Sequence, residues 1–376
     1  MIVFAARETD PHETRAALIP DTAKKLIDLG LEVQVEAGIG AKCDHADSEY
    51  AEAGAKVATD RVAALGAADF VFRVNKPPAD QVAQVKKGAV HISLLDPFNE
   101  GDLLKQIAAS GATAISLEMI PRTTLAQKMD VLSSQANIAG YEAAIVGAAR
   151  FGRIFPMLMT PAGTLSPAKV FVLGAAVAGL QAIATAKRLG ARVTAFDIRP
   201  EGLRDAESLG AKALRIDLGE TGSTDQGYAK ELTDEQKQMQ QEAQAKAIID
   251  SDVVITTAKL FGRPAPRLIA KDVIAKMRPG SVIVDLAADS GGNVEGTVLD
   301  EEVVTENGVK IVGIGNLERL AAQHSSQVYS ANLSNYLEHF WDEEEKQFKF
   351  DLEDEILKAS VLTHDGSIVH ERFKDA

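Results

Sequence analysis

The 376-residue chain contains one cysteine, Cys43, and one tryptophan, and aromatic residues make up only 5% of it. A single cysteine excludes a disulfide bond within the chain and any metal site built from several cysteines. The seven histidines are scattered and lack the short spacing of typical zinc ligands. The sequence therefore predicts neither a disulfide framework nor a metal centre.

Positive charge is also scarce, because 40 lysines and arginines stand against 54 aspartates and glutamates, a formal net charge of −14 at pH 7. Nucleic acids and anionic membrane surfaces would repel such a chain, so neither is an expected partner. No uninterrupted apolar run is long enough to span a bilayer, and the first residues show no apolar signal-peptide pattern. We therefore expect a soluble, cytoplasmic protein with no direct insertion into a bilayer.

Short apolar runs alternate with helical patterns along most of the chain, which is typical of parallel α/β folds. The first series ends near residue 130, and a helical stretch from about 134 to 151 leads into a second series. The tail 350–370 is expected to pack back on the first domain. The predicted fold class is α/β, with two Rossmann-like doubly wound domains separated by a cleft. The first is discontinuous, 1–130 plus 335–376, and the second covers 135–330.

The strongest generic motif is a predicted strand at 168–173, followed by a glycine-containing turn at 174–179 and a helical run to about 190. The next apolar run ends on Asp197, where dinucleotide-binding units place a carboxylate for the adenosine ribose. Glycines allow the sharp turn and a close helix–strand approach, and the helix N-terminus offers N–H groups to a pyrophosphate. The predicted nucleotide-binding residues of this motif are Gly174, Ala176, Val177, Ala178, Gly179, Asp197 and Ile198.

Ala176 stands where the fingerprint normally has its middle glycine, so we expect the pyrophosphate to bind slightly displaced. A βαβ unit that binds no nucleotide is the alternative interpretation. Asp197 favours NAD(H), because a carboxylate hydrogen-bonds ribose hydroxyls and repels a 2′-phosphate, whereas Arg199 argues mildly for NADP(H).

A second polar cluster lies in the segment 119–134, just before the second domain. Arg122 and Asp130 have a spacing that allows them to pair across a looped segment, with the Gln127 amide between them facing a ligand. An ordinary surface loop is the alternative interpretation.

An insertion at about 218–247 replaces the compact connection that the second domain would need. Its Gly227-Tyr228 core suits a mobile lid that lays an aromatic ring over a bound nucleotide. The alternative is a surface loop followed by a plain helix.

Together these segments resemble the NAD(H)-binding components of proton-translocating nicotinamide nucleotide transhydrogenases, members of the alanine dehydrogenase/transhydrogenase family, over essentially the whole length. The segments that carry the resemblance are Arg7-Glu8 with Arg15 and Pro20, then 121–141, 179–190, 227–231, 256–258, 277–287 and 291–293.

This resemblance implies specific site residues. A loop with Arg122, Gln127, Asp130 and Ser133 is expected to lie over the bound nicotinamide. The nucleotide is also expected to contact a closing loop and the segment after a later strand. These further positions are Gly227, Tyr228, Thr257 and Ala258.

The resemblance also implies the reaction. NADH on this chain would pass hydride, in the Si–Re specific manner, to NADP⁺ on a separate NADP(H)-binding component, and a membrane-spanning component would couple the transfer to proton translocation. A homodimer and a peripheral position at the inner face of the cell membrane, held by these partners, are further expectations.

Alanine dehydrogenase is the rival within the same family. Arg15 and Lys76 lie in contexts like those that bind the keto-acid carboxylate there, and Asp289 resembles an acidic residue of that site. The catalytic histidine is missing, because Asp96 falls at its position and His91 lies several residues too early. We therefore expect a transhydrogenase component, with an alanine dehydrogenase as the alternative and a non-catalytic NAD-binding protein as a weaker one.

Overall fold

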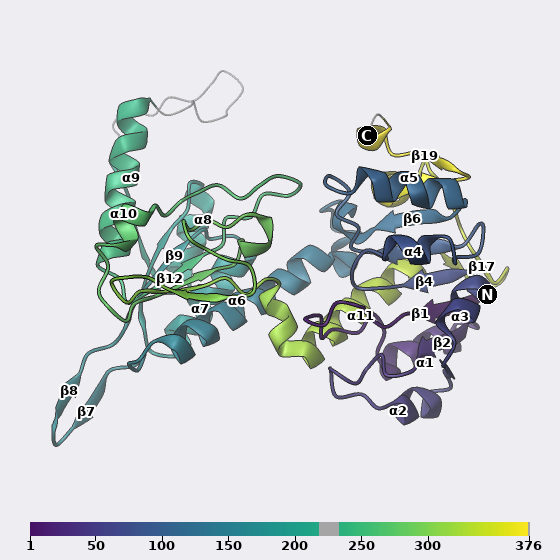
Figure 1. Cartoon of the computed structure of the whole chain (residues 1–376), viewed down its shortest axis with the longest axis horizontal. Helices are drawn as coiled ribbons and strands as arrows, with labels where there is room; N and C mark the ends of the chain where they lie inside the picture. The colour runs from purple at the N-terminus through teal and green to yellow at the C-terminus, as the bar shows by residue number, and fades with distance from the viewer. Residues whose placement is uncertain (218–232, 375–376) are drawn as a thin grey trace. The chain divides into compact units, whose positions relative to one another are not determined.

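The chain divides into two units, Met1–Gln135 with Glu318–Ala376 as unit 1 and Ala136–Leu317 as unit 2. The computed structural model describes residues 1–217 and 233–374 (Figure 1). Each unit is built on its own mainly parallel sheet, so the predicted α/β class with Rossmann-like doubly wound sheets is confirmed. The predicted lid residues Gly227 and Tyr228 lie outside the described residues.

Unit 1 contains an eight-stranded sheet in the order β19-β18-β6-β5-β4-β1-β2-β3. Strands β1 to β6 are parallel, and the C-terminal hairpin adds antiparallel to β6. The strands are β1 (Ile2–Ala5), β2 (Glu32–Glu36), β3 (Lys56–Ala58), β4 (Phe70–Phe72), β5 (Val90–Ser93), β6 (Thr113–Ser116), β18 (Val361–His364) and β19 (Ser367–Ile368). The order of connection reverses between β1 and β4, which makes that point the topological switch of this sheet.

The helices of unit 1 cover both faces of its sheet. They are α1 (Pro20–Asp28), α2 (Asp47–Glu52), α3 (Arg61–Ala67), α4 (Ala79–Val82), α5 (Gly101–Ser110), α11 (Ala322–His339) and α12 (Glu355–Ser360). Short 3₁₀ turns are η1 (Leu117–Met119), η2 (Gln127–Met129), η4 (Leu317–Ala321) and η5 (Glu371–Phe373), and a small hairpin joins β16 (Trp341–Asp342) to β17 (Gln347–Phe348).

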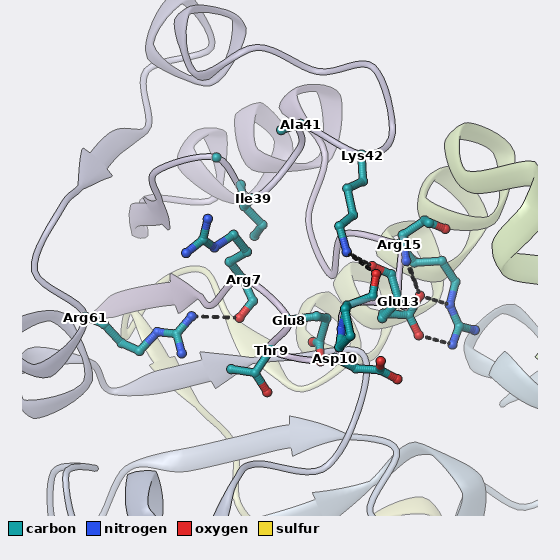
Figure 2. Close-up of a pocket in the computed structure, with 13 residues that line it drawn as sticks. Arg7, Glu8, Thr9, Asp10, Glu13, Arg15, Ile39, Ala41, Lys42 and Arg61 are labelled. Atoms are coloured by element: carbon teal, nitrogen blue, oxygen red, sulfur yellow. Dashed lines mark hydrogen bonds and ion pairs between the residues drawn. The ribbon is translucent and has the colours of Figure 1, made fainter.

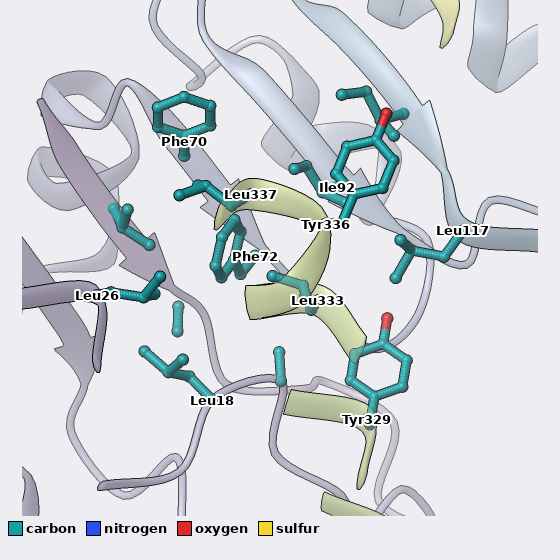
Figure 3. Close-up of a cluster of buried hydrophobic side chains, with 14 of the residues drawn as sticks. Leu18, Leu26, Phe70, Phe72, Ile92, Leu117, Tyr329, Leu333, Tyr336 and Leu337 are labelled. Atoms are coloured by element: carbon teal, nitrogen blue, oxygen red, sulfur yellow. The ribbon is translucent and has the colours of Figure 1, made fainter. Parts of the chain in front are cut away.

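Helix α11 fills the centre of the unit 1 core, where Tyr329, Leu333 and Leu337 pack against Leu18 and Phe72 (Figure 3). The predicted second domain extends to residue 330 and the predicted first domain resumes at 335, whereas unit 1 resumes at Glu318.

The reason for this difference is a set of buried serines on α11. Ser326 and Ser330 accept hydrogen bonds from the backbone N–H groups of Ala16 (2.9 Å) and Ile19 (3.2 Å), and both serines are fully buried. Serine gives no apolar pattern, so this contact surface is not visible as a hydrophobic stripe.

Unit 2 contains a seven-stranded sheet in the order β11-β10-β9-β12-β13-β15-β14, parallel except for the edge strand β14. The strands are β9 (Lys169–Leu173), β10 (Arg192–Phe196), β11 (Lys212–Ala213), β12 (Val253–Thr256), β13 (Val282–Asp285), β14 (Glu302–Val304) and β15 (Lys310–Val312). The helices are α6 (Val131–Arg150), which begins in unit 1, α7 (Val177–Arg188), α8 (Pro200–Ser208), α9 (Asp234–Ile249) and α10 (Lys271–Ile274), with a 3₁₀ turn η3 (Ala288–Ser290).

Alternation of side chains along β9 explains why both faces of this sheet are covered. Val170 and Val172 face the cluster formed with α6 and α7, whereas Phe171 and Leu173 face the cluster formed with α9 and α10. A strand that is buried on both faces reads as a continuous apolar run, as this one does.

Residues 234–247, which the sequence analysis included in the lid insertion, form most of helix α9. The helix begins with a capping box, in which Thr233 Oγ1 accepts from Gln236 N–H (3.2 Å) and Gln236 Oε1 accepts from Thr233 N–H (3.0 Å). The mobile-loop hypothesis therefore applies at most to the part that precedes Thr233.

A hairpin of β7 (Leu158–Thr160) and β8 (Gly163–Leu165) projects from unit 2 (Figure 1). All six strand residues are exposed, and Met159 keeps 79% of its surface open. Within the described residues, no helix combines the length and apolar character that a bilayer crossing requires.

Candidate functional site

The turn after β9 has the geometry that the fingerprint predicted. Gly174 adopts φ +100°, which favours glycine, and a Cβ placed on Gly179 would lie 1.9 Å from the Gly174 carbonyl oxygen. The turn lies at the carboxyl end of β9 beside β12, where the order of connection reverses in this sheet. Such a switch point is where doubly wound sheets bind ligands.

Helix α7 begins directly behind this turn. Ala176 is its N-cap and makes no side-chain capping bond, and the first helical hydrogen bond joins Leu180 N–H to Ala176 O at 2.8 Å. The N–H groups of Val177, Ala178 and Gly179 therefore precede the hydrogen-bond ladder and point out of the helix end. This arrangement, with the positive end of the helix dipole, can hold an anion.

Helix α6 supports the turn through a close backbone contact, because a Cβ placed on Gly140 would lie 2.1 Å from the Ala178 carbonyl oxygen. The sequence motifs gave Gly140 no role of its own. A glycine in the middle of a helix costs stability, and that cost is the signal that could have pointed to this close approach.

Asp197 follows β10 and lies beside the same turn. Only 8% of its surface is exposed, and its carboxylate accepts from the backbone N–H groups of Ala175 (2.7 Å) and Arg199 (2.8 Å). Burial by itself would raise the pKa of Asp197, but the hydrogen bonds from Arg199 and Ala175 outweigh it and lower that pKa below its ordinary value. The carboxylate is therefore ionised at neutral pH.

The guanidinium of Arg199 is committed to Asp197, with Nε 3.1 Å from Oδ1 and Nη2 3.2 Å from Oδ2. Because this guanidinium is already paired, it is less available to bind the 2′-phosphate of NADP(H). Ile198 between them is 80% exposed and presents an apolar side chain next to the carboxylate.

The segment after β12 closes the other side of the turn. Thr257 Oγ1 lies 3.2 Å from the carbonyl oxygens of both Leu173 and Gly174, so it ties β12 to the turn. Ala258 is held by the fully buried Asn293 amide, which accepts from Ala258 N–H (3.1 Å) and donates to Ala258 O (2.9 Å). In the sequence Asn293 stands out only as part of a motif, whereas in the structure its buried amide supports this segment.

The polar loop of unit 1 differs from its prediction in one respect. Asp130 accepts from Ser133 N–H (2.9 Å) and Ser133 Oγ (2.5 Å), so it caps the start of α6. Among the described residues no ion pair joins Arg122 to Asp130, so this predicted pair was wrong. Both carboxylate oxygens of Asp130 accept from Ser133 instead. Arg122 and Gln127 are both exposed.

This loop is nevertheless firmly anchored. The side chains of Ala126 and Met129 are fully buried, and the Lys128 carbonyl accepts from Asn332 (2.8 Å) and Asn335 (3.1 Å) of α11. The exposed side chains of Arg122 and Gln127 thus project from a loop whose backbone is hydrogen-bonded to α11.

The two cations that the resemblance to alanine dehydrogenase singled out are both neutralised within unit 1. Arg15 is 3% exposed and bonds Glu13 (2.7 and 2.8 Å), Glu318 (2.9 Å) and Gln135 (3.0 Å). Burial alone would raise the pKa of Glu13, but the guanidinium of Arg15 lowers it to about 2. The Glu13 carboxylate therefore stays ionised and paired with Arg15.

Lys76 lies 3.4 Å from Asp96 and 2.5 Å from Glu100. These carboxylates raise its pKa, even though burial alone would lower it. His91 is buried in the interior, where burial and then the Arg73 charge lower its pKa to about 3, and its Nε2 contacts Ser93 Oγ at 3.0 Å. In unit 2, Asp289 pairs with Lys259.

Comparison with known proteins fits this geometry. Two family models match, described as the alanine dehydrogenase/PNT N-terminal domain (residues 4–139) and C-terminal domain (residues 143–371). An NAD(P) transhydrogenase alpha-subunit chain of Rhodospirillum rubrum is 43% identical over 98% of both chains. A solved structure of transhydrogenase from Sinorhizobium meliloti matches with a TM-score of 0.89 at 43% identity, over 98% of this chain and 100% of that one.

An alanine dehydrogenase of Halomonas elongata is more distant, at 28% identity over 100% of this chain and 96% of its own. The resemblance that the sequence motifs indicated is thus confirmed by both domain matches and by the whole-length relatives. The chain belongs to the alanine dehydrogenase/PNT family.

Proposed function

We propose that this chain is the NAD(H)-binding component of a proton-translocating transhydrogenase. It passes hydride, with Si–Re specificity, between NADH bound here and NADP⁺ bound on a separate component. A membrane-spanning component couples that transfer to proton translocation. Relatives named as transhydrogenase alpha subunits support the general role. One structural observation favours this role over that of an alanine dehydrogenase, namely the neutralisation of Arg15 and Lys76.

An alanine dehydrogenase must bind the carboxylate of a keto acid, which requires cations with free hydrogen-bonding capacity. Here Glu13, Glu318 and Gln135 occupy the Arg15 guanidinium, and Asp96 and Glu100 hold the Lys76 ammonium. An incoming carboxylate would also meet the like charges of these groups. Asp96, moreover, carries no imidazole with which to exchange a substrate proton near neutral pH.

The proposed nucleotide site is the switch point of unit 2. The pyrophosphate is held by the N–H groups at the start of α7, displaced by the methyl group of Ala176, and Asp197 receives the ribose hydroxyls. Ile198 packs near the adenine, while Thr257 and Ala258 line the opposite side. In this proposal Gly227 and Tyr228 close over the nucleotide. For these two residues the proposal rests on the resemblance to transhydrogenases alone.

Hydride transfer between two nicotinamide rings moves no O–H or N–H proton, so it needs no general acid or base. The protein has to hold the two ring carbons about 3–3.5 Å apart and keep water out. We assign contacts with the nicotinamide to Arg122 and Gln127, which are exposed on an anchored loop. Asp130 and Ser133 position that loop through the cap of α6.

The exposed apolar hairpin β7–β8 supports the expectation of a homodimer. Leu158, Met159 and Leu165 present apolar side chains on a projecting two-stranded ribbon, and such ribbons are marginal in water unless they pack on something. In this proposal a second copy of the chain covers the hairpin, and the partner components bring the dimer to the membrane surface.

The decisive experiment mixes the purified chain with NADH, an NADP⁺ analogue and the cognate NADP(H)-binding component, and follows hydride transfer optically. A parallel reaction replaces the partner and the analogue with pyruvate and ammonium. Transfer that requires the partner, with a silent parallel reaction, is the expected result. Oxidation of NADH by pyruvate and ammonium without the partner would show an alanine dehydrogenase and overturn the proposal.

A further inference from the structure

Unit 1 contains a cavity of about 460 Å³ at the carboxyl ends of β1 and β2 (Figure 2). It lies between the loop that follows β1 and the loop that follows β2, with Arg61 at the start of α3 as a third wall. Its size is within the range of small-molecule pockets. Nothing in the proposed hydride transfer uses it.

The residues beneath this cavity repeat an arrangement found at the nucleotide site of unit 2. In unit 2, Leu173 of β9 is in register with Phe196 of β10, and the N–H group two residues after Leu173 donates to Asp197, the residue after Phe196, at 2.7 Å. In unit 1, Ala5 of β1 is in register with Val35 of β2. The N–H group two residues after Ala5 belongs to Arg7, and it donates to Glu36, the residue after Val35, at 2.9 Å.

The parallel extends to the environment of the two carboxylates. Glu36 is 7% exposed and Asp197 is 8% exposed, although Glu36 is the last residue of β2 and Asp197 directly follows β10. An arginine holds each of them through two nitrogens, since Arg61 Nε (3.0 Å) and Nη2 (2.9 Å) contact Glu36 as Arg199 contacts Asp197. Glu36 thus occupies the position in its sheet that a ribose-binding carboxylate has in a mononucleotide-binding half.

The two sites differ in how they can hold a phosphate. The chain after β9 turns at once into helix α7, whereas the chain after β1 runs as a loop to Pro20 and offers no helix end. In unit 1 two cations on the cavity wall could bind a phosphate instead of a helix end (Figure 2). Arg7 keeps its Nε 4.0 Å from Glu36, and Lys42 Nζ donates to the carbonyl oxygens of Pro11 (2.7 Å) and Glu13 (2.9 Å).

Neither cation is neutralised in the way that Arg15 is. The carboxylate nearest to Arg7 is already held by Arg61, and Lys42 bonds two neutral carbonyls, although an ammonium has three N–H donors. Of the acidic lining residues, Glu13 is paired with Arg15, and burial raises the pKa of Glu8 to about 7. The exposed Asp10 is the remaining carboxylate of the wall. An anion is therefore the ligand that the charges of this cavity favour.

We propose that the cavity binds a mononucleotide, with its phosphate on Arg7 and Lys42. Its ribose hydroxyls would reach the carboxylate of Glu36, which is 7% exposed and lies between the lining residues Arg7 and Arg61. The ribose part of this inference rests on the proposed role of Asp197, whereas the anion part rests on unit 1 alone. The site is separate in sequence and fold from the NAD(H) site, so a chain with both sites intact binds two molecules of AMP.

Calorimetric titration of the full chain with AMP tests this proposal. Asp197→Ala is expected to remove one of two binding events, and the event that remains is expected to weaken about tenfold or more in an Asp197→Ala, Arg7→Ala chain. Lys42→Met in the same background should weaken it similarly. Arg204→Ala is the matched control, because this exposed arginine pairs with Glu201 on its own helix and its loss removes the same charge.

Loss of all AMP binding in Asp197→Ala would overturn the proposal, as would an effect of Arg7→Ala no larger than that of Arg204→Ala. Inorganic phosphate binding the Asp197→Ala chain as tightly as AMP would also overturn it, because the ribose would then contribute nothing. NADH titrated into Arg7→Ala should bind as in the unaltered chain. Failure of NADH to bind any variant would count against the proposed function. The AMP titration of the Asp197→Ala chain would still show whether the unit 1 cavity binds AMP.

Discussion

Replacing Asp197 with alanine is the sharpest perturbation of the nucleotide site. Its carboxylate is ionised, buried and fixed by the N–H groups of Ala175 and Arg199, so it is prepared to accept from ribose hydroxyls without rearranging. A preorganised acceptor loses little free energy on binding. We therefore expect Asp197→Ala to weaken NADH binding strongly.

The magnitude follows from the hydrogen bonds that are lost. A hydrogen bond to a charged group contributes about 1.5–3 kcal/mol, which corresponds to roughly 10- to 100-fold in affinity. NADPH should respond differently, because the carboxylate repels its 2′-phosphate and the same change releases the guanidinium of Arg199 to bind that phosphate. The preference for NADH over NADPH should fall by about tenfold or more.

Fluorescence titration of each reduced nucleotide measures both affinities, and thermal melting verifies that the variant is folded. Arg199→Met is the matched control, since it removes the paired cation but keeps the carboxylate. In that control NADH affinity should stay within a few-fold of the unaltered chain. Equal losses of NADH and NADPH in Asp197→Ala would refute the assignment of the ribose to this carboxylate.

Four further predictions concern other parts of the chain. Gly179→Ala should abolish NADH binding and lower the melting temperature, because the new Cβ would lie 1.9 Å from a carbonyl oxygen, and wild-type affinity would contradict this reading of the turn. Gln127→Ala should lose hydride transfer while NADH affinity stays within a few-fold, and unchanged turnover would remove the residue from the site. Burial raises the native pKa of Glu8 from 4.5 to about 7. The folding stability that Glu8 contributes is therefore fully present below pH 4.5 and is lost as the pH rises to about 7. Glu8→Gln should therefore abolish up to about 3 kcal/mol of the stability loss seen by denaturant unfolding between these pH values, and an unchanged pH profile would refute it. Met159→Asp should convert a dimer to a monomer in light scattering, whereas Val304→Asp, at a similarly exposed apolar residue of the edge strand β14, should not.

Local sequence patterns were sufficient for the fold class and for the turn of the nucleotide motif. A continuous apolar run predicts a strand that is buried on both faces, and the required glycines depend on backbone geometry within a few residues. Gly174 at φ +100° and Gly179 against the Gly174 carbonyl have the conformations that the spacing indicated. The functional assignments of these residues stay predictions.

Sequence reasoning was less successful where the partner of a side chain is distant. It paired Arg122 with Asp130 on spacing, yet the carboxylate caps α6 by accepting from Ser133. It could not show that Glu318 neutralises Arg15, because 303 residues separate the two. It likewise gave no sign that buried serines fix α11 in unit 1.

The sequence by itself thus determined the secondary structure type, the two Rossmann-like sheets and the residues of the fingerprint, since each follows from short-range sterics and hydrophobic periodicity. Tertiary structure alone decided which charges are used in internal pairs and which remain available. Arg15 and Lys76 are held by carboxylates, whereas Arg7 shares Glu36 with Arg61 and Lys42 bonds backbone carbonyls at the cavity wall. The physical reason is that an ion pair depends on the distance between two side chains in space, and sequence separation does not set that distance.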